Sequence, residues 1–175
     1  MLYKAKLEDV EKILEIYEEA KRFMIKSGNP DQWDKSYPSK DIIISDIRDG
    51  ILYKYVIDNC IEAVTVIDFN GEESYNKIVE GGWSSNDKYA TIHRLAIGDK
   101  YRGKYISDKL LNSIFDIVKY NKYTWIRVDT HRKNLPMQKY LIRNGFKNTG
   151  IIYIRGNLER LAFERKIGGN NEKLF

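Results

Sequence analysis

Residues 90–129 constrain the fold of this 175-residue chain more strongly than any other segment. Residues 90–97 are mainly apolar and predict a strand, after which a turn over residues 98–104 leads into residues 107–120, whose apolar side chains recur at helical spacing. Residues 123–129 predict a second strand. A strand, a crossover helix and another strand form the unit that pairs two strands in parallel, and this crossover is almost always right-handed. The chain therefore requires a sheet with a parallel pair.

Further elements surround this unit. The sequence predicts a short strand over residues 2–5, a helix that ends before Gly28, a helix over 40–48, an antiparallel hairpin of strands 51–57 and 61–69, a helix over 135–143, and strands over 146–154 and 160–166. No internal repeat or low-complexity tract divides them. We therefore expect one domain over residues 1–167 and a flexible tail over residues 168–175.

The composition narrows the function classes. The formal charge of +5 arises from 30 Lys and Arg interspersed with 25 Asp and Glu, so no basic tract indicates a nucleic-acid partner. The N-terminus carries acidic residues early and no long apolar run follows, which argues against a signal peptide and a membrane anchor. The single cysteine, Cys60, excludes an internal disulfide and reads as a core filler on a strand. We expect a cytoplasmic protein.

The turn before the third predicted helix carries a candidate anion site. A helix that begins near Ser107 leaves its first backbone amides unpaired, and Arg102 and Lys104 add positive charge beside them. A phosphorylated ligand would suit this arrangement. The alternative is a solvated basic turn that is capped by Ser107 and Asp108. The spacing alone does not decide between the two.

Three stretches together resemble the GCN5-related N-acetyltransferase (GNAT) family. Residues 93–97 (His-Arg-Leu-Ala-Ile), followed by residues 101–104 (Tyr-Arg-Gly-Lys), are similar to the family's fourth strand and pyrophosphate loop, whose pattern is Gln/Arg-x-x-Gly-x-Gly/Ala. Asn134 and residues 144–146 (Asn-Gly-Phe) resemble a later segment, in which an Asn opens a helix that ends in a Gly-Phe turn. The N-terminal strand with residues 7–9 (Leu-Glu-Asp) is also typical of the family, and the resemblance extends over nearly the whole chain.

The resemblance implies both a fold and a reaction. The fold would be of the acyl-CoA N-acyltransferase type: an α/β (α+β) chain with about four helices and a mixed, mostly antiparallel sheet of about seven strands, in which the parallel pair near 90–97 and 123–129 is splayed. The reaction would be direct transfer of an acetyl group from acetyl-CoA, without a metal, to a primary amine of a small molecule or peptide. The implied cofactor-binding residues are Leu95, Ala96 and Ile97 for the pantetheine arm, Arg102, Gly103, Lys104, Tyr105, Ile106 and Ser107 for the pyrophosphate, and Asn134.

The chain departs from the family's pattern in two places. Tyr105 and Ser107 occupy the two small positions of the pyrophosphate loop. Tyr105 is the larger change, because either its side chain must point away from the phosphates or the loop must differ from that of relatives. Many relatives carry a Tyr four residues before the Gly of the Gly-Phe turn, where this chain has Leu141 with Tyr140 one step earlier. Adjacent helical residues point about 100° apart. Tyr140 is therefore a candidate acid for the leaving thiolate only if the helix register differs.

The reaction also needs a general base for the amine and a donor for the oxyanion. His93 resembles the position of a histidine proposed as a base in arylalkylamine members of the family, and its ordinary pKa of about 6.5 suits proton transfer near neutrality. The alternative is a strand histidine satisfied by hydrogen bonds in the core, in which case Asp129 or His131 would be the base. The oxyanion would be met by a strand amide within residues 95–97.

The acceptor site is expected between the first two helices and the loop that joins them. Asn29, Trp33 and Tyr37 could present aromatic and amide groups to an amine there, or, for Trp33 especially, pack the loop. Because the catalytic residues are not fixed by the pattern, a non-catalytic acyl-CoA-binding or sensor protein is an alternative function. A homodimer is one further expectation, by analogy with relatives.

Overall fold

The structure of the protein is a computed structural model, which describes residues 1–104 and 106–168. The predicted order of elements is confirmed, with small shifts at their ends. The strands and α-helices are β1 (Leu2–Lys4), α1 (Val10–Lys26), α2 (Lys40–Arg48), β2 (Leu52–Ile57), β3 (Cys60–Asp68), β4 (Tyr89–Ile97), α3 (Ile106–Tyr120), β5 (Trp125–Thr130), α4 (Leu135–Arg143), β6 (Lys147–Ile154) and β7 (Leu158–Lys166). Short 3-10 helices are η1 (Leu7–Asp9), η2 (Glu73–Asn76) and η3 (Asp99–Tyr101). The predicted tail lies outside the described residues beyond Gly168.

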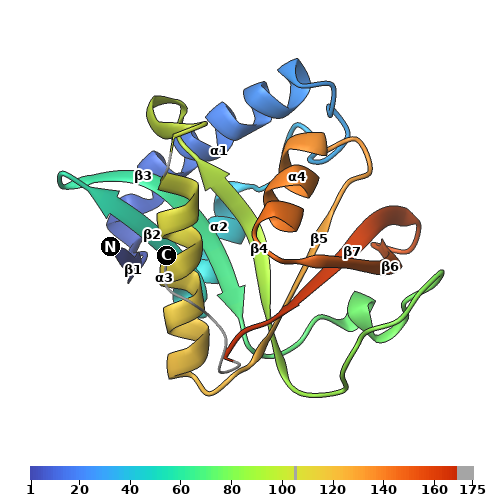
Figure 1. Ribbon diagram of the computed structural model, residues 1–175. Coiled ribbons are helices and arrows are strands. Elements are labelled where there is room, and N and C mark those ends of the chain that lie inside the picture. The colour runs from blue at the N-terminus through green and yellow to red at the C-terminus, as the bar shows by residue number, and fades with distance from the viewer. Residues whose placement is uncertain (105, 169–175) are drawn as a thin grey trace.

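The strands described form one seven-stranded sheet in the order β1-β2-β3-β4-β5-β7-β6. Neighbouring strands run antiparallel except β4 and β5, which are parallel. These two strands pair only through residues 89–91 and 125–127 and then diverge toward their carboxyl ends (Figure 1). The expected fold class, including the splayed parallel pair, is therefore confirmed.

Helices cover both faces of the sheet (Figure 1). On one face, α1 and α2 pack on β2, β3 and β4 through fully buried residues such as Ile13, Ile43 and Val64. On the other face, α3 contributes Leu110 and Ile114 to a larger cluster. Each such side chain stabilises the fold by about 1.5–3 kcal/mol when it leaves water. No helix in the described ranges is long and apolar enough to cross a bilayer.

The hairpin between β2 and β3 corrects the expectation for Cys60. The turn consists of Asp58 and Asn59, which have φ values of 48° and 63°, as the two-residue type I′ turn requires. Cys60 follows as the first residue of β3 and pairs with Ile57 at the closed end of the hairpin, directly beside the turn. Its side chain is exposed. Cys60 is therefore not a core filler, because the turn places it at the tip of the hairpin and not beneath a helix.

Candidate active site

The carboxyl half of β4 is open toward β5. In the described sheet, pairing between these strands ends at Thr91, whereas β3 remains paired with β4 as far as Ile97. The backbone of Leu95, Ala96 and Ile97 therefore does not bond to β5 and can meet an extended ligand, as predicted for a pantetheine arm. Ligands bind outside the carboxyl ends of strands where parallel neighbours separate.

A β-bulge lies within this open segment. Arg94 and Leu95 together lie opposite Thr65 of β3, so the ladder between the two strands is interrupted there. Arg94 has φ +49°, a conformation that costs a residue other than glycine about 1–3 kcal/mol. Bulges of this kind re-aim side chains beside active sites. This one separates His93, which lies before it, from the open segment that follows.

Two partners hold the bulge in place. The Arg94 guanidinium donates from Nη1 to the Tyr37 hydroxyl (2.8 Å) and from Nη2 to Asp46 Oδ2 (2.7 Å). Burial raises the pKa of the Asp46 carboxyl, and the charge of Arg94 opposes this change. A strained residue of β4 is thus fixed from α2 and from the loop that precedes α2.

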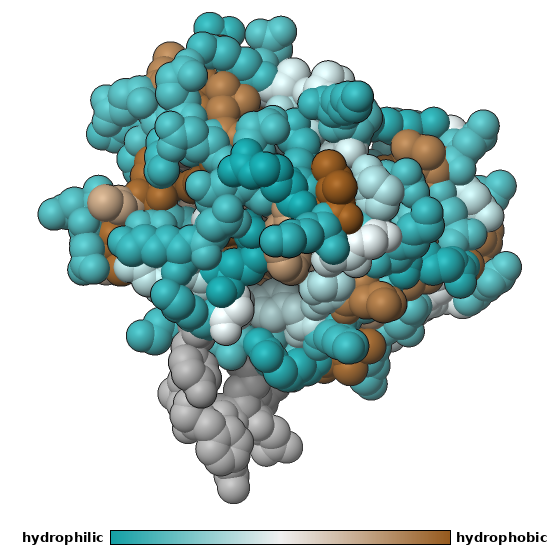
Figure 2. All heavy atoms as spheres, turned by 90° about the horizontal axis from the view of Figure 1, so that it is seen from above, coloured by the Kyte–Doolittle hydropathy of each residue, from teal (hydrophilic) through white to brown (hydrophobic). Residues whose placement is uncertain are grey.

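The predicted phosphate-binding loop exposes its backbone. Gly103 has φ +75°, and apart from its two chain neighbours no atom of the described residues lies within 4 Å of the position that a Cβ would occupy. Lys104 is exposed, and its Nζ lies 5.5 Å from the centre of the Tyr101 ring. The helix α3 begins at Ile106 directly after the loop. The face toward which β4 points is mainly hydrophilic (Figure 2). An open glycine, an exposed lysine and a helix N-terminus fit a pyrophosphate group.

Arg102 is engaged within the protein at the base of this loop. Its guanidinium pairs with Asp99, donates from Nη2 to the carbonyl of Ile97 (2.6 Å) and lies 4.5 Å from the centre of the Phe23 ring. These contacts tie the loop to β4 and α1, so Arg102 shapes the site through its position. Its direct contact with phosphate remains a prediction. Tyr105 lies outside the described residues.

Asn134 begins α4 and is connected to the loop between α1 and α2. Its Oδ1 accepts from the amide of Met137 (3.3 Å), and its Nδ2 donates to Oε1 of Gln32 (3.2 Å). The same oxygen of Gln32 also accepts from the amide of His131 (3.0 Å) and the hydroxyl of Thr130 (3.4 Å). Gln32 therefore links the acceptor-side loop to the end of β5, next to the residue predicted to contact the cofactor.

An open pocket of about 530 Å³ lies beside the bulge, between α2, the carboxyl end of β3 and the turn between β6 and β7. Carboxylates outnumber guanidinium groups among its lining residues. These charged residues are Asp46, Asp68, Glu72 and Asp129 against Arg94 and Arg155. His93 lies in the same lining. The pocket therefore favours a cationic group over an anionic one and places it beside an imidazole.

His93 is a half-buried histidine in the lining of this pocket. Its Nε2 lies 3.5 Å from Oε2 of Glu72, and its ring centre lies 6.3 Å from that of Tyr75. Burial lowers the pKa of the imidazole, while the charge of Asp129 opposes the shift. The neutral imidazole is thereby favoured near neutral pH, which is the form that a general base requires.

The two alternative bases are placed differently. Asp129 lines the pocket, but its Oδ1 accepts from the hydroxyl of Tyr75 (2.8 Å) and its Oδ2 lies 3.7 Å from Nε of Arg160. His131 is not among the residues that line the pocket, and its Nδ1 accepts from the amide of Lys133 (3.2 Å). Of the three candidates, His93 has the most direct access to a ligand in this pocket.

The three predicted acceptor residues do not converge. Tyr37 lines the pocket and accepts from Arg94. Trp33 packs edge-on against the rings of Tyr17 and Tyr37, with centres 5.6 and 6.1 Å apart, so it supports the pocket wall from behind. Asn29 is buried in the loop and donates to Gln32 (3.3 Å). The structure brings only Tyr37 of these three to the pocket.

Tyr140 lies beside the start of α3. Its hydroxyl donates to the carbonyl of Ser107 (2.7 Å), whereas Leu141 is buried in the core. Burial raises the pKa of the Tyr140 hydroxyl, and the charge of Asp108 raises it further. The hydroxyl therefore stays protonated at neutral pH, close to the residues predicted to bind the pyrophosphate.

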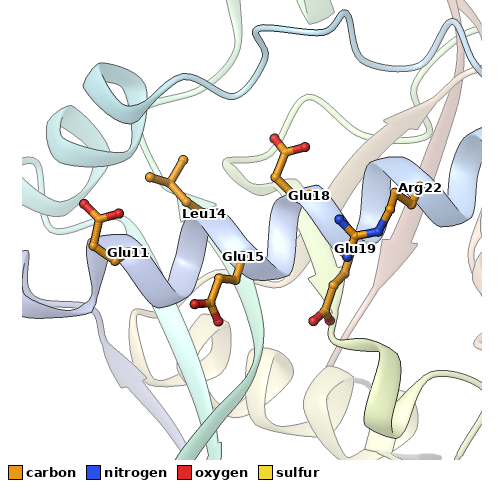
Figure 3. A pocket seen from close by; sticks show the side chains of 6 residues that line it. All are labelled: Glu11, Leu14, Glu15, Glu18, Glu19 and Arg22. Carbon is orange, nitrogen blue, oxygen red and sulfur yellow. The ribbon is translucent and has the colours of Figure 1, made fainter.

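A second hollow, of about 370 Å³, lies along the outer face of α1, and none of its lining residues lines the first pocket (Figure 3). Four glutamates line it, and they have partners elsewhere on the surface. Glu11 pairs with Lys40, Glu15 with Lys12 (2.7 Å) and Glu18 with Lys21 (2.5 Å), and Glu19 accepts from the amide of Asp99 (2.7 Å). This hollow is the solvated face of a surface helix.

Sequence reasoning missed several polar residues of the site, three of which shape its geometry. Asp46 and Glu72 lie in the pocket, and Gln32 joins its loop to β5. None of them belongs to a motif. The one available signal is the turn chemistry of Asn70-Gly71, which indicates a loop after β3 and places Glu72 within it.

Comparison with known proteins shows which solved structures share this fold. Neither a scan of protein-family models nor a search of curated proteins gave a match. Among solved structures, a GNAT-family acetyltransferase from Streptococcus agalactiae is 29% identical, with 97% of this chain and 96% of that chain covered and a TM-score of 0.86. A GNAT-family acetyltransferase from Listeria monocytogenes is 18% identical, with 95% and 94% covered and a TM-score of 0.73.

A third structure carries a ligand. The PaiA N-acetyltransferase from Thermoplasma acidophilum, in complex with coenzyme A, is 18% identical, with 95% of this chain and 98% of that chain covered and a TM-score of 0.69. All three structural similarities extend over nearly the whole chain, as does the resemblance that was based on the sequence motifs. The chain thus has the fold of the GCN5-related N-acetyltransferases, and the resemblance to that family, first indicated by its motifs, is confirmed.

Proposed function

We propose that the protein transfers an acetyl group from acetyl-CoA directly to a primary amine of a small molecule or peptide. One observation supports this most: a half-buried histidine lies in a pocket with an excess of carboxylates, two residues before a strand segment that is open to an extended ligand. An imidazole of lowered pKa beside a site for a cation suits the deprotonation of an ammonium group. Acetyl-CoA would supply the activated acetyl group as a thioester.

Different residues of the chain would bind the cofactor and carry out the steps of the transfer. The exposed backbone at Gly103 and the first turn of α3 would hold the pyrophosphate, and the open backbone of residues 95–97 would orient the pantetheine arm. His93 would remove the proton that leaves the amine nitrogen free to attack. A backbone amide of the same strand would stabilise the negative charge on the carbonyl oxygen. Tyr140 would protonate the departing sulfur.

A non-catalytic acyl-CoA-binding or sensor protein is the second candidate. It is favoured by the hydrogen bond from Tyr140 to the Ser107 carbonyl, because this bond occupies the proton that Tyr140 would give to the leaving thiolate. A thiol is, however, a tolerable leaving group because its pKa is about 8.5. Loss of the acid would slow the reaction without preventing it.

An assay of thiol release distinguishes the two functions. The protein is mixed with acetyl-CoA and pooled polyamines, amino acids, aminoglycosides, arylalkylamines or peptide N-termini, and free thiol is followed over time. We expect release above the rate of hydrolysis in at least one pool, with an acetylated amine detected by mass spectrometry. Binding of acetyl-CoA by calorimetry without turnover in any pool would instead establish the sensor function.

Replacement of Tyr140 by phenylalanine tests the proposed acid. We expect kcat to fall by about tenfold, less than the 10²- to 10⁴-fold typical of acid–base groups, because the thiolate leaves without full protonation. The measurement is kcat against pH. Tyr153→Phe is the matched control, since Tyr153 is an exposed residue of β6. If Tyr140→Phe leaves both the maximal rate and its pH profile unchanged, Tyr140 is not the acid.

A further inference from the structure

Glu72 holds its carboxylate against the candidate base in a fixed geometry. Its Oε1 accepts from the amide (3.1 Å) and the hydroxyl (2.8 Å) of Ser74, and its own amide donates to the hydroxyl of Tyr89 (3.3 Å). These contacts leave Oε2 directed at Nε2 of His93, 3.5 Å away. The carboxylate of Glu72 is thus positioned from two sides before any ligand arrives.

We infer that Glu72 is a positioning residue for His93; this inference rests on the proposed acetyl transfer. Its carboxylate would accept a hydrogen bond from Nε2–H, which keeps the proton on Nε2 and leaves the lone pair of the imidazole on Nδ1. When Nδ1 takes a proton from the ammonium of the acceptor, one N–H bond breaks, one forms, and the electron pair of the amine becomes free. The negative charge of Glu72 stabilises the imidazolium that results.

The distance of 3.5 Å suits this role. It exceeds the usual length of an N–H···O bond, as is common for catalytic pairs before the substrate binds. The side chains of His93 and Glu72 are 21% and 33% exposed. The attraction between a carboxylate and an imidazolium therefore acts at a partly shielded site, where it is stronger than in bulk water.

The other charges that face His93 have hydrogen-bond or ion-pair partners of their own, although the charge of Asp129 also raises the pKa of His93. From α2 and β4, Asp46 and Arg94 pair with each other (2.7 Å). From β3, Asp68 accepts from the amide and the side chain of Asn70 (both 2.9 Å). From β5, Asp129 accepts from Tyr75, a buried phenol beside His93, and lies near Arg160. Of the carboxylates that face His93, Glu72 is the one that the structure places within 4 Å of a ring nitrogen of His93.

The test compares Glu72→Gln with Glu73→Gln in the full chain. Both changes remove one negative charge from adjacent residues, but Glu73 is exposed and does not line the pocket. The pKa of His93 is measured by NMR with labelled histidine, and His131, the one other histidine of the chain, is the internal reference. The rate constants kcat and kcat/KM are measured against pH for both variants.

We expect Glu72→Gln to lower the pKa of His93 by about one unit, because one of the nearby charges that favour the imidazolium is lost. It should also lower kcat by tenfold or more. The acidic limb of the kcat/KM profile should move to lower pH by about one unit, as the pKa of His93 does. Glu73→Gln should change the pKa by no more than about 0.2 unit.

Two results would overturn the inference. An unchanged pKa of His93 in Glu72→Gln would show that the carboxylate does not act on the imidazole, and this result is independent of any enzymatic activity. A lowered pKa with an unmoved acidic limb and an unchanged kcat would show that Glu72 touches His93 without a part in the reaction. Absence of turnover in the unmodified protein, with the pKa shift present, would contradict the proposed function alone.

Discussion

Replacement of His93 by glutamine is expected to lower kcat by about 10²- to 10⁴-fold, the usual contribution of a general base. Glutamine keeps a polar side chain of similar length but cannot take a proton at neutral pH. The residues predicted to bind acetyl-CoA lie on the loop at 102–107 and on residues 95–97, so calorimetry should give an unchanged affinity for acetyl-CoA. The rate is measured with an acceptor found in the assay of thiol release.

The dependence of kcat/KM on pH in this variant tests directly whether His93 is the base. Burial lowers the pKa of His93, so the neutral base forms at a lower pH than for an ordinary histidine. In the unmodified protein, kcat/KM should rise with pH through that lowered pKa and then level off. In His93→Gln the rise should be absent. His131→Gln is the matched control, and a larger loss there would transfer the role of base to His131.

The strand, loop and helix of residues 90–120 could be predicted because their pattern is local. A mainly apolar run followed by apolar residues at a period of 3.6 specifies β4 and α3 without reference to the rest of the chain. The same holds for α4, which begins after Asn134 and ends before Gly145 as its caps require. The position of the open segment followed from these elements, because a crossover helix forces β4 and β5 to be parallel neighbours.

The acceptor pocket could not be predicted in the same way. Asp46 meets Arg94 across 48 positions of sequence, and Gln32 meets His131 across 99. Such contacts depend on tertiary packing, which no local pattern encodes. The bulge at Arg94 is a second reason, because a side chain with φ +49° points where strand alternation does not place it. Trp33 and Asn29 were predicted from residue type alone, and the loop turns both away from the pocket.

The largest effect on stability is expected from the buried ion pair of Arg127 and Glu164. Their side chains are 7% and 1% exposed, and Nε of Arg127 lies 3.8 Å from Oε2 of Glu164. The guanidinium carbon lies 4.1 Å from the ring centre of Trp83 and 4.0 Å from that of Tyr89. Glu164 Oε1 accepts from the amide of Ser84 (2.7 Å). The pair therefore fastens the connection between β3 and β4, which carries Glu72, to the sheet.

Replacement of Arg127 by methionine should lower the free energy of unfolding by about 3–5 kcal/mol, because it leaves a buried carboxylate without its cation. The measurement is urea unfolding. Arg132→Met is the matched control: Arg132 pairs with Glu159 at the surface, where the two side chains are 61% and 37% exposed, and its loss should cost about 0–1 kcal/mol. Adding Glu164→Gln to Arg127→Met should recover part of the loss, since the unpaired charge is then removed. Equal losses for Arg127→Met and Arg132→Met would show that the rings of Trp83 and Tyr89 hold the connection without the ion pair.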